Sequence, residues 1–213
     1  MKAIYDLLLQ RQSQGKKSLA VLIDPDKTEK LSELLSIAEK FPPDFFLIGG
    51  SLLSEGKIEN CIRKIRSSSI APVILFPGNE MQINDSADAI LLLSVISGRN
   101  PELLIGRHVV SAALLRASEL EIISTGYILV ESGAPTAVSY ISNTQPIPRD
   151  KNSIASLTAM AGEQLGMKLI YLEAGSGAQL PVPVAMIDNV RKNTSIPILT
   201  GGGLKTKEEI TER

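Results

Sequence analysis

The chain of 213 residues contains no tryptophan, one cysteine and one histidine. Because Cys61 has no second cysteine to pair with, a disulfide framework is excluded and a reducing, cytoplasmic compartment is expected. His108 is alone and falls in a helical pattern far from any predicted strand end, so no histidine-based triad or zinc site can be assembled. Aromatic residues make up only 4% of the chain, which argues against base stacking and against a sugar-binding platform.

Strong charge and long apolar runs are also missing. The net charge is -1 and 21% of the residues are charged, which indicates neither a nucleic-acid surface nor a polybasic membrane surface. No run approaches the roughly 18 apolar residues that a membrane-spanning helix requires. Residues 1–17 contain a short apolar stretch broken by Asp6, with no small-residue cleavage site after it, and we interpret them as an amphipathic surface helix.

Short apolar runs alternate with helical patterns along the chain. Strands are predicted at residues 18–23, 45–48, 73–76, 89–95 and 126–130, followed by two that end at Glu173 and Thr200. Helices are predicted at residues 28–39, with Thr28 as the N-cap, and at 58–66, 105–115, 154–165 and 184–192. Each strand is a near-continuous apolar run, which is typical of a parallel sheet covered on both faces. The spacing of strands and helices fits right-handed crossover units.

The ends of the strands favour one fold class. Nearly every strand ends in Gly, Pro, Asp or Ser, as on the catalytic face of a (β/α)8 barrel. A doubly wound sheet stays open as an alternative, but no G-x-G-x-x-G follows the first strand. We therefore predict a single α/β domain over residues 1–213, a modified TIM (β/α)8 barrel whose eighth strand is absent from this chain. Residues 79–88 are too few for a crossover with a full helix, and the polar residues 132–151 are a candidate lid.

The last two predicted strands deliver an acid, a phenol and two glycine-rich turns. Tyr171 and Glu173 are two residues apart, so their side chains lie on the same side of a strand. Glu173 is either a general base or the ion-pair partner of a lysine such as Lys168 or Lys205. Tyr171 either hydrogen-bonds a substrate hydroxyl or fills the barrel. The turns at residues 175–177 and 201–203 predict phosphate binding by backbone N–H groups, although the first could also be a simple tight turn.

The exits of the first two strands carry further candidates. Asp24 is either a Mg²⁺ ligand, because hard cations take carboxylate oxygens, or a cap of the next helix. Spacing alone favours an ordinary N-cap role for Ser51. Asp26 is interpreted as a cap or as the ion-pair partner of Lys27. Two loop cations, Arg99 and Lys151, could meet a diphosphate or simply be solvated.

Several motifs, taken together in order and spacing, carry a family resemblance. They are LIDPDK at residues 22–27, IGGS at 48–51, LFPG at 75–78, SGRNP at 97–101, TGY at 125–127, PIP at 146–148, YLEAGSGA at 171–178 and GGG at 201–203. Along almost its whole length the chain resembles the geranylgeranylglyceryl phosphate synthases and their heptaprenylglyceryl phosphate synthase relatives. In that family an eighth strand ends in a Gly-Asn pair that also grips the phosphate, and this chain stops before it. Ser124 stands where proline is expected.

The resemblance implies a modified TIM barrel and a Mg²⁺-dependent prenyltransferase of lipid biosynthesis. It would join a long-chain prenyl diphosphate, geranylgeranyl diphosphate foremost, to sn-glycerol 1-phosphate and release diphosphate. The resemblance assigns Mg²⁺ to Asp24 and Ser51, and proton removal to Glu173 with Tyr171 beside it. It assigns glycerol phosphate to Tyr171, Leu172, Glu173, Ala174, Gly175, Ser176, Gly177, Gly201, Gly202 and Gly203.

The same resemblance implies a cytoplasmic homo-oligomer without a transmembrane segment, and it leaves open a peripheral membrane contact for the lipid product. Two other functions stay open on the residues alone. One is a phosphosugar isomerase or aldolase on the same barrel, although no lysine ends a predicted strand. The other is a non-catalytic protein that binds a phosphate ligand.

Overall fold

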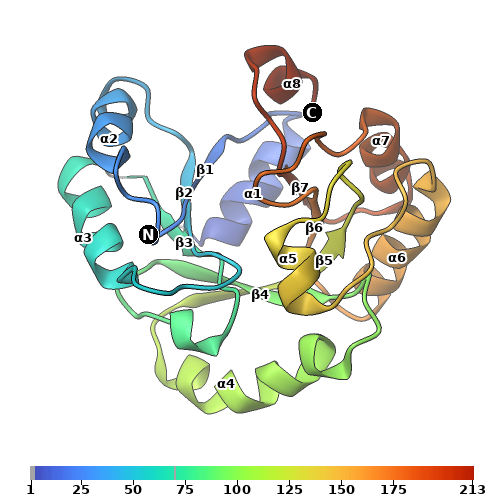
Figure 1. Cartoon of the computed structure of the whole chain (residues 1–213), viewed down its shortest axis with the longest axis horizontal. Coiled ribbons are helices and arrows are strands. Elements are labelled where there is room, and N and C mark those ends of the chain that lie inside the picture. Colours follow the sequence, from blue (N-terminus) through green and yellow to red (C-terminus); the bar gives the residue numbers. More distant parts are fainter. Residues whose placement is uncertain (1–2, 70) are drawn as a thin grey trace. The chain divides into compact units, whose positions relative to one another are not determined.

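A computed structural model describes residues 3–69 and 71–213, and the chain divides into two compact units. Unit 1 comprises the chain up to Leu92 together with Val109–Ile123, and unit 2 comprises Leu93–His108 and Ser124–Arg213. The strands follow one another in the sheet in the order in which they occur along the chain, β1 to β7, and every recorded strand pair is parallel. Strands alternating with helices confirm the predicted modified TIM-barrel class (Figure 1).

Unit 1 is built from the first strands and the helices that cover them. Its elements are α1 (Ile4–Ser13), β1 (Ala20–Ile23), α2 (Leu31–Lys40), β2 (Phe45–Ile48), α3 (Ile58–Ser68), β3 (Val73–Leu75) and the 3₁₀ turn η1 (Glu80–Gln82). Two further elements, β4 (Ala89–Val95) and α4 (Arg107–Ala117), belong partly to this unit. Helix α3 buries Ile58, Cys61, Ile62 and Ile65, a spacing that places one apolar stripe against the sheet. Phe46 and Ile48 of β2 complete this core.

Unit 2 contains the later strands and a separate apolar core. Its elements are the π-helical turn η2 (Glu102–Gly106), most of β5 (Glu121–Leu129), α5 (Ala137–Ser142), α6 (Asn152–Gln164), β6 (Leu169–Glu173), α7 (Val184–Asn193), β7 (Ile198–Gly201) and α8 (Lys207–Glu212). Helices α6 and α7 pack side by side (Figure 1). Ile170 and Leu172 of β6 pack into this core, so the alternation of a strand turns Tyr171 and Glu173 to its other face.

Most predicted elements are confirmed, and the differences have local causes. The ranges of β2 and β4 match the prediction. Thr28 is not an N-cap, because α2 begins at Leu31 after a turn in which the Leu31 N–H donates to the Thr28 carbonyl. Strand β5 begins at Glu121, five residues earlier than predicted, where the Glu121 N–H donates to the carbonyl of Asp88. Residues 79–88 hold only the short turn η1, as their length required.

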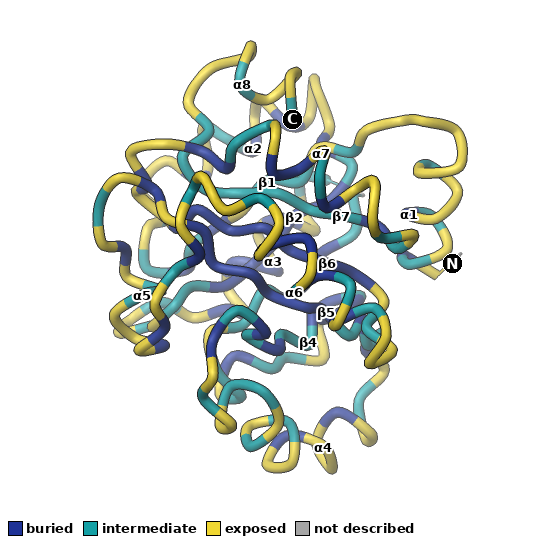
Figure 2. Tube along the Cα trace, turned by 90° about the vertical axis from the view of Figure 1, so that its right-hand side faces the viewer, coloured by how far each residue is buried: buried dark blue, intermediate teal, exposed yellow. Residues whose placement is uncertain are grey.

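Burial follows the layers within each unit. Strand β2 is buried at all four positions, whereas α4, labelled at the foot of Figure 2, is largely exposed. Strand β6 is buried at all five positions, which is what its continuous apolar run predicts. Among the described residues, no helix combines the length and the apolar character needed to cross a bilayer.

Candidate active site

Strand β6 ends in a buried acid, Glu173, of which only 5% is exposed. Its Oε1 atom accepts the backbone N–H of Gly175 at 2.5 Å, and its carboxylate also hydrogen-bonds the hydroxyl of Tyr171. These two groups, rather than Lys168 or Lys205, are its partners. The Lys205 ammonium instead donates to the carbonyl of Gln179 at 3.4 Å. Of the two predicted roles of Glu173, the structure therefore favours the general base over the ion-pair partner of a lysine.

The surroundings of Glu173 raise the pKa of its carboxyl group toward neutral pH. Burial disfavours the ionised form and raises the pKa of Glu173 to about 7, although the hydrogen bonds from Gly175 and Tyr171 oppose that shift. Burial and the nearby charge of Glu173 raise the pKa of Tyr171 well above its ordinary value, so the phenol stays protonated and donates. The Tyr127 ring stacks on Tyr171 with centroids 5.7 Å apart. A carboxylate with this pKa can accept a proton at physiological pH and release it again.

The three glycines after β7 lie directly against this acid and phenol. Glu173 is the register partner of Gly201 across the β6–β7 pair. A Cβ atom on Gly201 would stand 2.2 Å from the Tyr171 hydroxyl oxygen, and one on Gly202 would stand 2.5 Å from Oε1 of Glu173. Gly202 and Gly203 also have positive φ values of 82° and 70°, which side chains rarely tolerate. Glycine is thus required here both for space and for backbone conformation.

Backbone N–H groups are left without acceptors beside Glu173. Within residues 3–69 and 71–213, the N–H groups of Ser176, Gly177, Gly202 and Gly203 donate to no other residue. Such unpaired N–H groups on glycine-rich turns are suited to anions. The other predicted binding residues are placed differently. Leu172 and Ala174 have their side chains in the apolar core of unit 2, and the N–H of Ala174 donates to Gly201.

Residues of the predicted lid line a partly open cavity beside the exit of β5, which the sequence did not reveal. The cavity measures about 310 Å³ and is lined by Leu129, Val130, Glu131, Ser132, Gly133, Ala134, Pro135, Thr136, Ser139 and Pro146. A Cβ atom on Gly175 would lie 2.6 Å from Thr136, which places the lid beside the loop that follows β6. A parallel bridge between Val130 and Ile147 fixes the far end of the lid.

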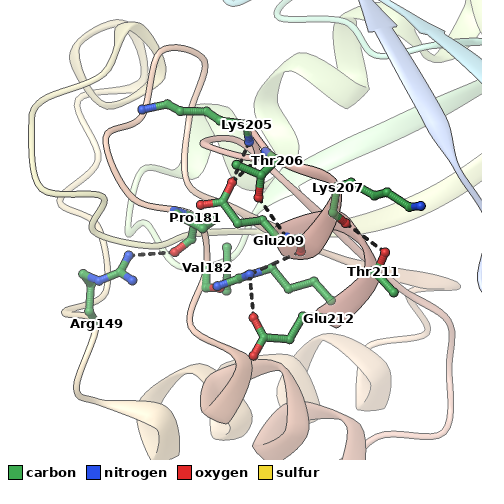
Figure 3. A network of polar contacts seen from close by, with 10 residues as sticks. Arg149, Pro181, Val182, Lys205, Thr206, Lys207, Glu209, Thr211 and Glu212 are labelled. Atoms are coloured by element: carbon green, nitrogen blue, oxygen red, sulfur yellow. Dashed lines mark hydrogen bonds and ion pairs between the residues drawn. The ribbon is translucent and has the colours of Figure 1, made fainter.

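Cationic side chains fasten the segment that borders Gly203. Figure 3 shows Arg149 donating to the carbonyl of Pro181, at 2.9 Å. Arg213 donates to the neighbouring carbonyl of Val182 at 2.7 Å. A Cβ atom on Gly203 would stand 2.8 Å from the Leu180–Pro181 peptide, so this fastened segment forms the wall behind the glycines. Thr206 and Glu209 cap the first turn of α8 nearby (Figure 3).

The two loop cations considered from sequence have local roles. Lys151 pairs with Asp150 at 2.7 Å. Arg99 donates to the carbonyls of Ile96 and Gly98. Both arrangements agree with the interpretation of these residues as ordinary loop cations.

In unit 1, Asp24 follows β1 and lies beside the glycines that follow β2. Its Oδ1 atom accepts the Asp26 N–H at 3.1 Å, and its Oδ2 atom lies 3.1 Å from the Lys27 ammonium. A Cβ atom on Gly50 would stand 3.2 Å from that Oδ1 atom, so Asp24 borders the residue before Ser51. The Ser51 hydroxyl has no hydrogen-bond partner among the residues that the structure describes.

These donors fit a hard cation. The Asp24 carboxylate remains 27% exposed, and carboxylate and hydroxyl oxygens are ligands that Mg²⁺ accepts. The described residues contain no cluster of three or more His, Cys, Asp or Glu side chains that could enclose a metal by themselves. Mg²⁺ commonly binds through one or two protein ligands and completes its shell with water and substrate phosphates. Asp24 and Ser51 match that limited contribution.

Asp26 was predicted to be a cap or the ion-pair partner of Lys27, and the second of these is wrong, because Lys27 pairs with Asp24. Its carboxylate accepts the N–H and the hydroxyl of Ser54 and the N–H groups of Glu55 and Gly56. The backbone hydrogen bonds, that of Ser54 foremost, lower the pKa of Asp26 to about 2. Asp26 is therefore an ionised anchor for the loop that follows β2. The groups that donate to Asp26 are 28 to 30 positions away in sequence, which is why spacing could not predict them.

Known proteins are similar to this chain in sequence over most of its length. The sequence profile described as the PcrB family matches residues 12–213. A geranylgeranylglyceryl phosphate synthase of Spirosoma linguale is 54% identical over 200 residues, which are 93% of this chain and 80% of that protein. One of Chitinophaga pinensis is 50% identical over 208 residues, or 97% of this chain and 82% of that protein.

A solved structure agrees in fold over the whole chain. The (S)-3-O-geranylgeranylglyceryl phosphate synthase of Thermoplasma acidophilum, crystallised with its substrate sn-glycerol-1-phosphate, superposes with a TM-score of 0.90 and 28% identity. The match covers 100% of this chain and 86% of that one.

Proposed function

Because this chain belongs to the PcrB family and is a prenyltransferase of the geranylgeranylglyceryl phosphate synthase type, we propose the following reaction for it. It transfers a long-chain prenyl group, geranylgeranyl foremost, from the diphosphate to a hydroxyl of sn-glycerol 1-phosphate. The observation that carries the proposal is Glu173. It is a buried carboxyl with a pKa of about 7 that lies against Gly202, next to N–H groups free to bind a phosphate.

The residues of unit 2 bind and activate the alcohol. The N–H groups of Ser176, Gly177, Gly202 and Gly203 hold the phosphate, which positions the hydroxyl toward Glu173. Glu173 takes the proton of that hydroxyl while the alcohol oxygen forms a bond to the allylic carbon of the donor. The bond from that carbon to the diphosphate breaks, and the electron pair leaves with the diphosphate. Tyr171 keeps the carboxylate oriented through its hydrogen bond.

The residues of unit 1 serve the leaving group. Asp24 and Ser51 would hold Mg²⁺, which when bound neutralises charge on the diphosphate. Lys27 pairs with Asp24 and is largely exposed, and in this proposal it exchanges that partner for a diphosphate oxygen. An allylic carbon stabilises positive charge, so a weak alcohol nucleophile suffices once it is positioned.

A direct assay tests the reaction. Radiolabelled sn-glycerol 1-phosphate is incubated with geranylgeranyl diphosphate, with and without Mg²⁺, and with sn-glycerol 3-phosphate as the matched control. We expect a prenylated product only with Mg²⁺ and with the 1-phosphate. Phosphate binding without any prenyl transfer would support the non-catalytic alternative. Turnover of phosphosugars would support the isomerase or aldolase alternative. Donors of increasing length then measure the preferred chain.

We also propose that the enzyme works as a cytoplasmic homo-oligomer, with peripheral membrane contact when the lipid product leaves. The outer surface of α4 supports association, because Val109 and Val110 are each 70% exposed and Leu114 is 50% exposed. Exposed apolar groups gathered on one helix favour contact with another surface. Light scattering on the purified protein measures the assembly, and a monomer at micromolar concentration would contradict it.

A further inference from the structure

The loops that follow β2 and β3 touch each other backbone to backbone. A Cβ atom on Gly49 would stand 1.9 Å from the carbonyl oxygen of Phe76, and one on Gly78 would stand 2.3 Å from the carbonyl oxygen of Gly50. No side chain fits between these peptides. The path of the backbone through Gly50 and into Ser51 is therefore set by groups that reach it from elsewhere.

Gln82 is the side chain that reaches it. It lies in η1 and is only 3% exposed. Its Oε1 atom accepts the N–H of Gly50 at 3.3 Å and the N–H of Gly78 at 3.2 Å, and its Nε2 atom donates to the Gly50 carbonyl at 2.8 Å. One buried amide thus binds both polar groups of Gly50 and ties them to the next loop.

Asp26 holds the same loop from its other side. It accepts three backbone N–H groups and one hydroxyl from residues 54–56. Ser51 lies between these two attachments, and Asp24 lies beside Gly50. The carbonyl of Gly50 that Gln82 binds belongs to the peptide that leads directly into Ser51. Gln82 therefore binds the peptide from which the Ser51 side chain extends, although it is 31 positions away in sequence.

We propose that Gln82 is a positioning residue for the proposed cation–diphosphate site of unit 1. It fixes the Gly50–Ser51 peptide so that the Ser51 hydroxyl and the Asp24 carboxylate present their oxygens together to a cation–diphosphate ligand. This inference rests on the proposed function. Gln82 itself contacts no substrate atom, so its loss should weaken binding of the diphosphate substrate and spare binding of glycerol phosphate.

The test compares Gln82→Leu with Gln82→Glu. Leucine keeps the volume and removes all three hydrogen bonds, whereas glutamate keeps the acceptor for both N–H groups and loses the donor. Calorimetry with Mg²⁺ and inorganic diphosphate should show binding weakened about 10-fold or more in Gln82→Leu and less in Gln82→Glu. The KM for the prenyl diphosphate should rise in the same order, while the KM for sn-glycerol 1-phosphate stays within about 2-fold. Hydrogen exchange at the Gly50 and Gly78 amides should accelerate only in the leucine variant.

Asp88→Asn is the matched control. Asp88 also joins neighbouring strands of unit 1, since it accepts the Val73 N–H at 2.7 Å and pairs with Arg66 at 2.9 Å. It does so at the amino-terminal end of β3, away from the strand exits. This variant should lower the melting temperature without changing diphosphate binding.

The outcomes separate the inference from the proposed function. Unchanged Mg²⁺–diphosphate affinity in Gln82→Leu would overturn the positioning role. So would an equal loss in Asp88→Asn, because general destabilisation would then explain both. If the unmodified protein binds diphosphate no better with Mg²⁺ than without it, the proposed cation site fails first and the role of Gln82 fails with it.

Discussion

Asp26 in unit 1 and Glu173 in unit 2 are both acids at or near the end of a strand. Their surroundings shift their pKa values in opposite directions. Asp26 remains partly exposed and accepts four hydrogen bonds, with a pKa lowered to about 2. Glu173 is buried with two donors, and its pKa is raised to about 7. Hydrogen bonds to the charged form and desolvation act with opposite sign. One acid is therefore a permanent anion that organises a loop, and the other can exchange a proton.

The glycines of the two units also differ, in the groups for which they make room. In unit 1, Gly49 and Gly78 make room for the backbone of a neighbouring loop. In unit 2, Gly201 and Gly202 make room for the side chains of Tyr171 and Glu173. A glycine-rich strand exit is thus no evidence of anion binding by itself. The unpaired N–H groups distinguish the second case from the first.

The largest expected effect comes from Glu173→Gln. Removing the proton acceptor should lower kcat about 10²- to 10⁴-fold, the range of general acid–base catalysis, and should leave glycerol phosphate binding largely intact. Glu163→Gln is the control. That acid lies in the same unit, but it accepts from Ser195 ahead of β7 and its pKa is lowered. Steady-state kinetics with calorimetry check both. Full activity in Glu173→Gln would exclude it as the base.

Gly202→Ala should have the second-largest effect, which we expect on substrate binding. Its Cβ atom would stand 2.5 Å from Glu173 Oε1 and from the Gly175 nitrogen, on a backbone with φ of 82°. We expect the KM for sn-glycerol 1-phosphate to rise about 10-fold or more, because the added methyl group would displace the Glu173 carboxylate or the glycine-rich turns beside it. A 10-fold change corresponds to about 1.4 kcal/mol. Gly166→Ala separates strain from contact, since Gly166 has φ of 87° and nothing within 4 Å of its Cβ position. If both substitutions change KM equally, direct contact at Gly202 is not the cause.

Tyr171→Phe should have a smaller effect on rate and a clear effect on pH dependence. In the unmodified enzyme, kcat/KM should rise with pH and level off above a midpoint of about 7, the pKa of Glu173. The Tyr171 hydrogen bond lowers that pKa, so its removal should move the midpoint to higher pH. A pH–rate profile measures this, and Tyr127→Phe serves as the control on the adjacent ring. If the midpoint of the pH–rate profile does not move, the Tyr171 hydrogen bond does not set the pKa of Glu173.

The smallest effects are on stability, and they have opposite signs. Glu173 has a folded-state pKa above its ordinary 4.5, so the folded protein keeps a proton that the unfolded chain has lost between pH 4.5 and about 7. Stability falls as pH rises through that window, and Glu173→Gln should raise the melting temperature above pH 7.

Asp26 has a folded-state pKa of about 2, below its ordinary 3.8. Its contribution is complete above pH 3.8 and is lost as pH falls through 2. Asp26→Asn should therefore lower the melting temperature at pH 7, with a gap that closes toward pH 2. Thermal melts across pH compare the two variants, and gaps of the same sign at pH 7 would contradict the opposition of these two acids.

Parts of the site could be predicted because their signals are local. The alternation of β6 places Tyr171 and Glu173 on one face from their spacing alone, and their hydrogen bond confirms it. Thr28 failed as a cap because a turn delays the start of α2 to Leu31. Gln82 gave no signal, since a single amide in a polar loop looks solvated until the fold buries it.

By itself, the sequence determined where the strands run, that they are parallel, and which exits carry an acid, a hydroxyl and glycines, because apolar periodicity and backbone preference act over a few residues. Only the tertiary structure decided which acid exchanges a proton. The pKa of Glu173 depends on water excluded by neighbouring segments, and that of Asp26 on N–H groups about 30 residues away. Solvent exclusion and the meeting of distant donors are properties of the folded chain.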